Sequence, residues 1–280
     1  MKQYDSIKPQ IDAAAVKRYF NNITGGTAAS VSMMTHEYNL PVSASLYRLE
    51  KEIGTIRDWL NMVPASGQVL DVGCGAGVWT ELFAKRYKVV VGIEQSRLML
   101  QAATERVAGL PNVRLIEGDV RHDLPKSSFD MIFFGGLCMY LSDGDVVELL
   151  HSLKGRLNKG GMIILRESTV PQGMHLSQGE YQAVYRNVDT YRQLFEEADS
   201  FHIEVRRNYG YTNLVTAEEL VHLRRKWLPF LSKDSTALGS LTWWGLRVTT
   251  PISFCVLPRI FSQLNIQWPR LQNHFFRLSR

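Results

Sequence analysis

Short hydrophobic runs alternate with amphipathic stretches through the middle of the chain. Near-continuous apolar runs of strand length occur at 68–72, 88–93, 113–117, 129–134, 162–166 and 201–207. Stretches with apolar residues at helical spacing lie between them, at 78–87, 96–107, 143–157 and 189–198. Strands that are apolar on both faces and alternate with helices indicate a parallel sheet covered on both sides. The pattern therefore predicts a doubly wound α/β domain.

The same pattern divides the chain into three parts. Residues 1–65 are a predicted helical lead-in that caps the substrate, with helical spacing over 11–20 and 44–60. Residues 66–215 are the predicted α/β core, and residues 216–280 are an aromatic extension interrupted by prolines. From residue 215 onward there are nine lysines and arginines against three acids, whereas the whole chain has a net charge of +5. The positive charge therefore belongs to the C-terminal extension.

Composition sets the class of protein and its compartment. Hydrophobic residues make up 45% of the 280 residues and charged residues 21%, as in a folded globular protein. The three cysteines are far apart and show neither a disulfide framework nor the spacing of metal ligands. The first residues lack the apolar stretch of a signal peptide. We therefore expect a cytoplasmic protein without a metal.

The first predicted strand runs into a glycine-rich loop, Asp71-Val72-Gly73-Cys74-Gly75-Ala76-Gly77. Such a loop lets a nucleotide-like ligand approach the backbone closely. A dinucleotide fingerprint requires glycine or alanine where Val78 stands. Asp71 would also repel a pyrophosphate. A ligand with a cationic amino group and no phosphate, such as S-adenosylmethionine, fits the loop better.

Two further acids follow predicted strands. Glu94 ends the second strand, where a carboxylate can accept hydrogen bonds from both hydroxyls of a ribose. Asp119 follows the third strand, where it could accept a hydrogen bond from an exocyclic amine of adenine. Open α/β sheets bind their ligands at the carboxyl ends of the strands, so these acids and the glycine loop should share one site.

Residues 68–169 resemble the class I (seven-stranded, Rossmann-like) S-adenosylmethionine-dependent methyltransferase family. The resemblance rests on five segments in the family's order, namely 69–77, Val91-Gly92-Ile93-Glu94, Glu117-Gly118-Asp119-Val120, Phe129-Asp130-Met131-Ile132 and Leu157-Asn158-Lys159-Gly160-Gly161. It implies a mostly parallel seven-stranded sheet and S-adenosylmethionine as the methyl donor, with S-adenosylhomocysteine as the product. The predicted cofactor-binding residues are Asp71, Gly73, Cys74, Gly75, Gly77, Glu94, Gln95, Asp119, Val120 and Gly135.

The family places its reaction centre beyond the fourth strand, which here is the segment from Gly135 to Tyr140. Tyr140 is predicted to wall the methyl group, whereas Cys138 lacks an adjacent cation and is expected to be a buried thiol. Glu167 and His36 are the candidate general bases.

Four residues are predicted to contact the acceptor. They are Arg166, His175, Tyr185 and Arg186. An arginine suits a carboxylate or phosphate group on the acceptor. The alternative for Arg166 and Glu167 is ion pairing with other charges of the protein.

The predicted function is methyl transfer, at oxygen of a hydroxyl, carboxylate or phosphate, to a small molecule, a glycan or a lipid-linked acceptor. One alternative is a protein N-terminal or side-chain N-methyltransferase, since Tyr19-Phe20, Arg166-Glu167-Ser168, Arg186 and Asp189 resemble features of the N-terminal α-amine methyltransferases. A second is a non-catalytic module that binds S-adenosylmethionine. A nucleic-acid substrate is not expected, because residues 134–137 lack the Asn/Asp-Pro-Pro-aromatic signature of base-amine methyltransferases.

The C-terminal extension places tryptophans beside cations. It contains Trp227 and the pair Trp243-Trp244, and its most apolar window, 238–257, is interrupted by Arg247 and Pro251, which makes a poor membrane span. Cations beside aromatic rings are typical of a segment that lies on a membrane surface. The alternative is a subdomain that packs on the sheet or on a second subunit, so the oligomeric state stays open.

Overall fold

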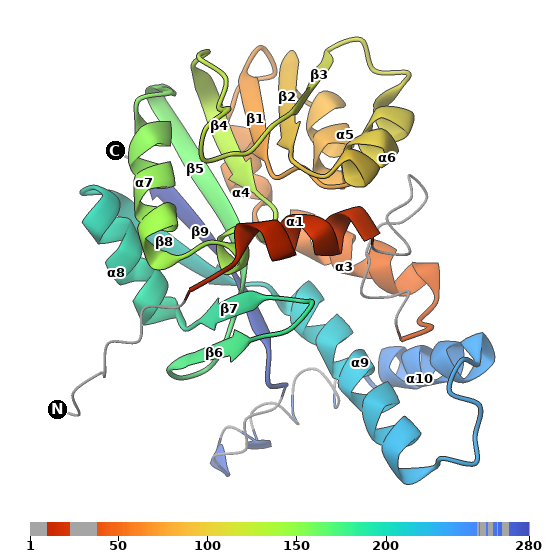
Figure 1. Cartoon of the computed structure of the whole chain (residues 1–280). Coiled ribbons are helices and arrows are strands. Elements are labelled where there is room, and N and C mark those ends of the chain that lie inside the picture. Colours follow the sequence, from red (N-terminus) through yellow and green to blue (C-terminus); the bar gives the residue numbers. More distant parts are fainter. Residues whose placement is uncertain are drawn as a thin grey trace, which may run out of the picture.

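The computed structural model describes residues 10–22, 38–250, 252, 256, 260, 261, 263, 264 and 269–279. These residues form a central sheet with helices on both faces, and α1 lies across the carboxyl ends of the strands (Figure 1). The doubly wound α/β fold predicted from the hydrophobic pattern is thus confirmed.

The sheet has nine strands, so the predicted number of seven is wrong. The strands are β1 (Gln68–Val72), β2 (Val89–Glu94), β3 (Val113–Glu117), β4 (Phe129–Phe134), β5 (Leu157–Thr169), β6 (Met174–Ser177), β7 (Ala183–Arg186), β8 (His202–Arg207) and β9 (Gln272–Ser279). The order β3-β2-β1-β4-β5 is parallel throughout. The two additional strands are β6 and β7, a hairpin that joins the sheet through the pairing of Thr169 with Arg186.

The strand β9 comes from the end of the chain and lies between β5 and β8, antiparallel to both. Phe275 and Phe276 are fully buried and belong to two different hydrophobic clusters. Successive side chains of a strand point to opposite faces, so this pair fills both layers of the core. The part of the chain predicted as a C-terminal extension therefore contributes a central strand of the sheet.

The helices cover both faces of the sheet and extend beyond one end of it (Figure 1). They are α1 (Ala13–Asn22), α3 (Val42–Thr55), α4 (Arg57–Met62), α5 (Val78–Ala84), α6 (Arg97–Val107), the short 3-10 helix η1 (Cys138–Tyr140), α7 (Asp143–Lys154), α8 (Val188–Ala198), α9 (Tyr209–Trp227) and α10 (Thr236–Val248). One hydrophobic cluster joins the sheet to α7 and α8, and a second joins it to α4 and α5. The stretch 44–60, predicted as one helix, is divided between α3 and α4 at Ile56.

Candidate active site

A pocket lies at the carboxyl ends of β1, β2, β3 and β4, where the sequence predicted the cofactor. Five predicted residues line it, namely Gly73, Glu94, Gln95, Asp119 and Val120. Tyr140, predicted to wall the methyl group, lines it too. Parallel strands end at the same edge of the sheet, which explains how loops from distant parts of the sequence meet here.

The glycine loop turns through left-handed backbone conformations. Gly73, Gly75 and Gly77 have φ values of +68°, +54° and +76°. A side chain would be strained at all three positions. A Cβ on Gly73 would also lie 3.1 Å from Cδ1 of Leu137, which lines the same pocket, and a Cβ on Gly77 would lie 3.0 Å from that of Ala103. The glycines are therefore required by the shape of the loop.

Glu94 ties the glycine loop to the end of β2. Its Oε2 accepts a hydrogen bond from the backbone N–H of Gly75 at 3.0 Å, and its Oε1 accepts one from that of Ser96 at 2.9 Å. Burial raises the pKa of the Glu94 carboxyl despite these two bonds. Each carboxylate oxygen can accept a second hydrogen bond, so Glu94 still has acceptor capacity for the hydroxyls of a ligand.

Asp71 is a second buried carboxyl beneath the pocket. It is 1% exposed and accepts a hydrogen bond of 2.6 Å from Oγ1 of Thr80. The pKa of the Asp71 carboxyl is raised to about 7, mainly by burial and to a smaller extent by the nearby charge of Glu94. Buried carboxyls with raised pKa values cluster at functional sites, because a cationic ligand can compensate for the charge that burial disfavours.

The raised pKa of Asp71 predicts how stability changes with pH. Its carboxyl titrates at about 7 in the folded protein and at 3.8 in the unfolded chain, so the folded state binds more protons between these values. The contribution of Asp71 to the free energy of unfolding therefore falls as the pH rises through this window. We expect the Asp71→Asn variant without ligand to gain on the order of 1–3 kcal/mol relative to the parent between pH 4 and pH 8.

Urea unfolding of parent and variant at several pH values measures this effect. Asp58→Asn is a control of opposite sign, because the hydrogen bond from Arg206 lowers the pKa of Asp58. That control should lose stability relative to the parent as the pH rises. A stability difference between Asp71→Asn and the parent that does not change with pH would contradict the assignment.

Asp119 is held by an arginine that the sequence analysis did not single out. Nε of Arg121 donates to Oδ1 of Asp119 at 3.0 Å and its Nη2 donates to Oδ2 at 2.6 Å. The hydrogen bonds from Arg121 lower the pKa of Asp119. Arg121 itself lines the pocket. Since the two residues are only two positions apart, the pair could have been suspected from the sequence.

The helix α1, which lies across the carboxyl ends of the strands (Figure 1), contributes to the wall of the pocket. Its apolar residues Ala13 and Val16 line the pocket, which the sequence analysis did not predict. Oγ of Ser96 donates a hydrogen bond of 3.1 Å to the carbonyl of Phe20 and lies 2.9 Å from Oδ1 of Asn21. The helical lead-in thus reaches the cofactor side of the site as well as the side where an acceptor was expected.

A cluster of tyrosines adjoins the pocket. The hydroxyls of Tyr140 and Tyr181 lie 3.3 Å apart, and those of Tyr181 and Tyr185 lie 2.9 Å apart. The rings of Tyr19 and Phe20 on α1 pack edge-on against Tyr181 and Tyr140, with centroids 5.1 Å apart in both pairs. Burial raises the pKa of Tyr140, Tyr181 and Tyr185, so these phenols remain protonated. Tyr140 belongs to both the pocket and this tyrosine cluster.

Glu167 does not face the pocket as a base would. Its carboxylate is fully buried, and its Oε1 accepts hydrogen bonds from the backbone N–H groups of Leu137 and Cys138 at 3.2 and 3.1 Å. Burial raises its pKa to about 7. In the structure Glu167 holds the backbone of the segment that carries Tyr140, and its predicted role as a general base stays a prediction.

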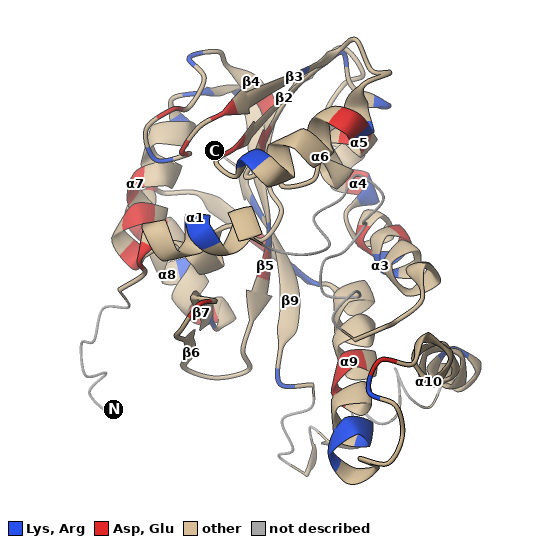
Figure 2. Ribbon diagram, turned by 45° about the vertical axis from the view of Figure 1, so that its right-hand side comes forward, with Lys and Arg blue, Asp and Glu red and all other residues tan. Residues whose placement is uncertain are grey.

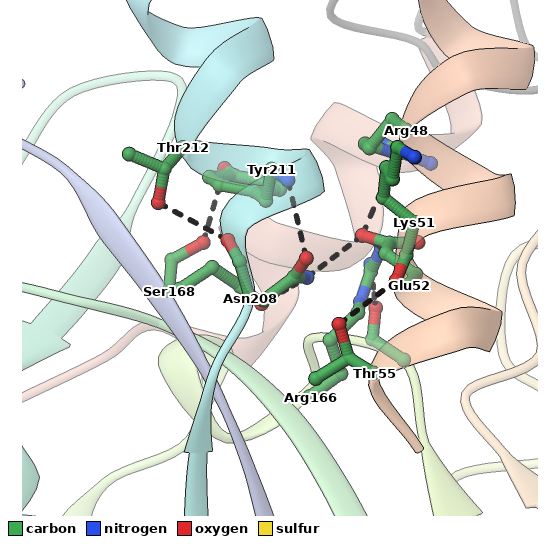
Figure 3. A network of polar contacts seen from close by, with 11 residues as sticks. Arg48, Lys51, Glu52, Thr55, Arg166, Ser168, Asn208, Tyr211 and Thr212 are labelled. Atoms are coloured by element: carbon green, nitrogen blue, oxygen red, sulfur yellow. Dashed lines mark hydrogen bonds and ion pairs between the residues drawn. The ribbon is translucent and has the colours of Figure 1, made fainter. Parts of the chain in front are cut away.

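Arg166 is bound within the protein rather than directed at a ligand. Its Nη1 lies 3.1 Å from Oε1 of Glu52, and its Nη2 donates to the carbonyl of Gly135 at 2.5 Å. Figure 3 shows Glu52 between α3 and β5, where it also accepts from Nδ2 of Asn208 at 3.0 Å. Burial alone would raise the pKa of Glu52, but Arg166 and Arg48 lower it. Arg166 thus forms the ion pair that was the alternative interpretation, and its predicted contact with the acceptor stays a prediction.

Arg186 is the clearest departure from the predicted site. Its side chain is fully buried, pairs with Asp143 at 2.7 Å and donates to the carbonyls of Cys138 and Leu141 at 2.8 Å each. These bonds hold η1 in place, and the predicted contact of Arg186 with the acceptor stays a prediction.

The remaining predicted residues lie in different places. His175 is exposed and stacks on Tyr185 from the paired strand, with centroids 6.0 Å apart. His36 lies outside the described residues. Cys74 and Cys138 are buried, and burial raises the pKa of both thiols well above the ordinary value.

Comparison with known proteins agrees with this geometry. Residues 69–161, which contain the glycine loop, Glu94, Asp119 and Tyr140, match the family model described as a methyltransferase domain. Residues 69–161 are thus similar to a methyltransferase domain. The strands β2 to β4, β1 apart from its first residue, and all the pocket-lining residues except Ala13 and Val16 of α1 fall within the matched range.

Curated relatives match part of the chain. A trans-aconitate 2-methyltransferase of Afipia carboxidovorans is 36% identical over 114 residues, which are 39% of this chain and 43% of the relative. A demethylmenaquinone methyltransferase of Staphylococcus aureus is 28% identical over 51% of this chain and 71% of the relative. The chain thus spans less than half the length of the first of these relatives.

Solved structures share the fold over a longer range. A phosphoethanolamine N-methyltransferase 2 of Haemonchus contortus, in complex with phosphomonomethylethanolamine and S-adenosylhomocysteine, has a TM-score of 0.61. It is 15% identical and covers 94% of this chain and 60% of its own. A SAM-dependent methyltransferase of Leishmania major has a TM-score of 0.56 at 21% identity, over 70% of this chain and 75% of its own. At these identities the similarity establishes the fold.

Proposed function

We propose that the protein is an S-adenosylmethionine-dependent methyltransferase that acts on a small-molecule acceptor. The observation that carries this proposal is one pocket, at the carboxyl edge of the sheet, lined by the glycine loop, Glu94 and Asp119. The cofactor would supply an electrophilic methyl group on a sulfonium centre. Burial raises the pKa values of the carboxyls Asp71 and Glu94, and a bound cation would favour their negatively charged forms.

The residues of the pocket have separate roles in this proposal. Glu94 binds the ribose hydroxyls with the acceptor capacity that Gly75 and Ser96 leave unused. The glycine loop brings its backbone close to the methionine part of the cofactor, since no Cβ intervenes. Asp119 and Val120 contact the adenine, and Arg121 fixes the orientation of the Asp119 carboxylate. The apolar side of α1 closes the pocket and excludes water from it.

The tyrosine cluster is the proposed acceptor side, because Tyr140 connects it to the cofactor pocket. Its phenols stay protonated and can orient an acceptor by hydrogen bonds, but they are poor bases. The predicted base Glu167 holds a backbone segment instead. We therefore propose transfer to an acceptor that needs no deprotonation by the protein, namely an ionised oxygen of a carboxylate or phosphate group.

The alternative acceptor is an amine, which also attacks without a protein base when it is neutral. The names of the relatives include both kinds, since trans-aconitate offers carboxylates and phosphoethanolamine offers an amine and a phosphate. Aromatic rings such as those of Phe20 and Tyr19 would favour the cation that forms on nitrogen. A lipid-linked acceptor with a phosphate group would belong to the first class, the ionised oxygens, and a protein N-terminus would belong to the second, the amines.

An assay of S-adenosylhomocysteine release tests the proposal. The protein is incubated with S-adenosylmethionine and, in turn, trans-aconitate, phosphoethanolamine, a demethylated menaquinol and a short peptide, and mass spectrometry identifies the methylated atom. We expect product from at least one carboxylate or phosphate compound and none from the Glu94→Ala variant. Product from amines alone would replace the oxygen acceptor by nitrogen. Cofactor binding without transfer to any acceptor would support the non-catalytic module.

A further inference from the structure

The helix α10 is apolar on two opposite faces. Its inner face carries Trp243 and Leu246, which are buried in a cluster with Leu214 and Val221 of α9. Its outer face carries Leu241, Trp244 and Val248, at positions i, i+3 and i+7, which share one side of a helix. These three outer side chains are 61%, 63% and 61% exposed. Packing against the part of the chain that the structure describes therefore does not explain the outer face.

The end of α9 adds exposed aromatic residues at the same end of the molecule (Figures 1 and 2). Trp227 is 70% exposed and Phe230 is 79% exposed. Aromatic side chains this exposed are unusual on a soluble surface, and several together mark an interaction site. The outer face of α10 together with Trp227 and Phe230 is called the docking surface below.

The chain that carries the docking surface is rich in cations. Between the last turn of α9 and the end of α10 lie Arg224, Arg225, Lys226, Lys233 and Arg247, with the single acid Asp234. Both Nη atoms of Arg224 are buried and Nε of Arg225 donates to the carbonyl of Lys233, so the exposed cations of this segment are Lys226, Lys233 and Arg247. Figure 2 shows the blue turn at the end of α9 and the nearly uncharged ribbon of α10. Nζ of Lys226 lies 5.5 Å from the ring centroid of Trp227. Cations and tryptophan are thus presented together.

We propose that the docking surface binds membranes that contain anionic phospholipids. Tryptophan and phenylalanine rings insert at the level of the headgroups, while neighbouring lysines and arginines pair with lipid phosphates. A second copy of the chain is a poorer partner, because a two-fold contact would bring the same cations against one another. None of the helices among the described residues is both long and apolar enough to cross a bilayer. The proposed contact is therefore one with the membrane surface.

One helix, α9, links the docking surface to the end of β5 near the proposed acceptor side. The helix α9 begins beside β5, where the hydroxyl of Tyr211 accepts a hydrogen bond of 3.1 Å from Oγ of Ser168, and ends at Trp227. Membrane binding would therefore hold the acceptor side of the molecule near the lipid surface. This inference goes beyond the proposed function and depends on neither cofactor binding nor methyl transfer.

Vesicle flotation with the full chain tests the proposal. The vesicles are either phosphatidylcholine alone or an equal mixture of phosphatidylcholine and phosphatidylglycerol. We expect binding to the mixed vesicles only, weakened by raising the salt from about 0.1 M to about 0.5 M. Trp244→Glu should lower the partition coefficient at least about tenfold, since it removes an inserted ring and adds a repelled charge.

Ser240→Glu is the matched control. It adds the same charge to an exposed position of α10 but leaves the outer apolar face intact, so it should bind mixed vesicles within roughly fivefold of the parent. Circular dichroism and calorimetric titration with S-adenosylhomocysteine check that both variants are folded. The proposal is overturned if the parent binds neither kind of vesicle, or if Trp244→Glu and Ser240→Glu bind equally. It is also overturned if the parent is a dimer that Trp244→Glu dissociates while vesicle binding is unchanged.

Discussion

Alanine in place of Glu94 is expected to lower the affinity for S-adenosylhomocysteine by roughly 100-fold, as two charge-assisted hydrogen bonds to the ligand are lost. The substitution also frees the backbone N–H groups of Gly75 and Ser96, which the carboxylate accepts from in the structure. The glycine loop then loses its tie to β2. Both effects lower the affinity of the pocket for S-adenosylhomocysteine.

Isothermal titration calorimetry measures this loss against a matched control. Glu117 is the register partner of Glu94 on β3 and also ends its strand, but its side chain is 45% exposed and pairs with Arg97. Glu117→Ala should therefore leave the affinity within about threefold of the parent. Equal affinities of the parent and Glu94→Ala would contradict the assignment of the pocket. Glu94→Gln separates the charge from the hydrogen bonds, because the amide keeps one acceptor oxygen.

Methionine in place of Arg186 is expected to lower the free energy of unfolding by about 3–5 kcal/mol, the usual cost of removing one member of a buried ion pair. The long apolar side chain fills much of the space of the arginine, so little of the loss comes from a cavity. The loss of stability arises because the carbonyls of Cys138 and Leu141 lose their hydrogen-bond donor and the carboxylate of Asp143 loses its ion-pair partner.

Denaturant unfolding measures this difference, and Arg192→Met provides the comparison. Arg192 is an exposed residue of α8, so the same chemical change there should alter stability by no more than about 0.5 kcal/mol. If the two variants are equally stable, the buried network of Arg186 does not stabilise the fold. A variant of Arg186 that is stable but fails to methylate would revive its predicted role in binding the acceptor.

The elements that the sequence predicted well are those with a local signal. The apolar runs of β1, β2 and β4 are mostly buried on both faces, so their pattern is continuous, whereas the edge strand β3 is only partly buried. The bounds of all four strands agree with the predicted ranges within about one residue. The glycine loop and Glu94 were predictable because each follows directly on such a run. The predicted helical stretch 96–107 begins at a residue that caps α6, since Oγ of Ser96 accepts from the backbone N–H of Met99.

The elements that were missed depend on distant partners. The strand β9 pairs with residues more than one hundred positions earlier, and nothing within its own eight residues indicates that partner. The strands β6 and β7 have only four residues each, which is too short for a clear pattern, and only β7 is buried. Both were hidden for the same physical reason, since their burial is created by tertiary pairing.

The charged residues at the end of β5 show the same limit. Arg166 and Glu167 end a strand at the ligand-binding edge, which is where acceptor contacts are expected from sequence. Their partners are Glu52, at a separation of 114 residues, and the backbone of Leu137 and Cys138, at about 30 residues. The sequence predicted the correct edge of the sheet. Only the fold reveals that Arg166 is paired with Glu52 and that Glu167 accepts hydrogen bonds from the backbone.

The position of β9 between β5 and β8 determines when the sheet can finish folding during synthesis on the ribosome. Until residues 272–279 have emerged, β5 and β8 lack their shared neighbour and present unpaired backbone groups at open edges. The buried layers also lack Phe275 and Phe276 until then. Closure of the sheet must therefore wait until residues 272–279 have been synthesised, and a chain shortened at residue 215 would keep an open, aggregation-prone sheet.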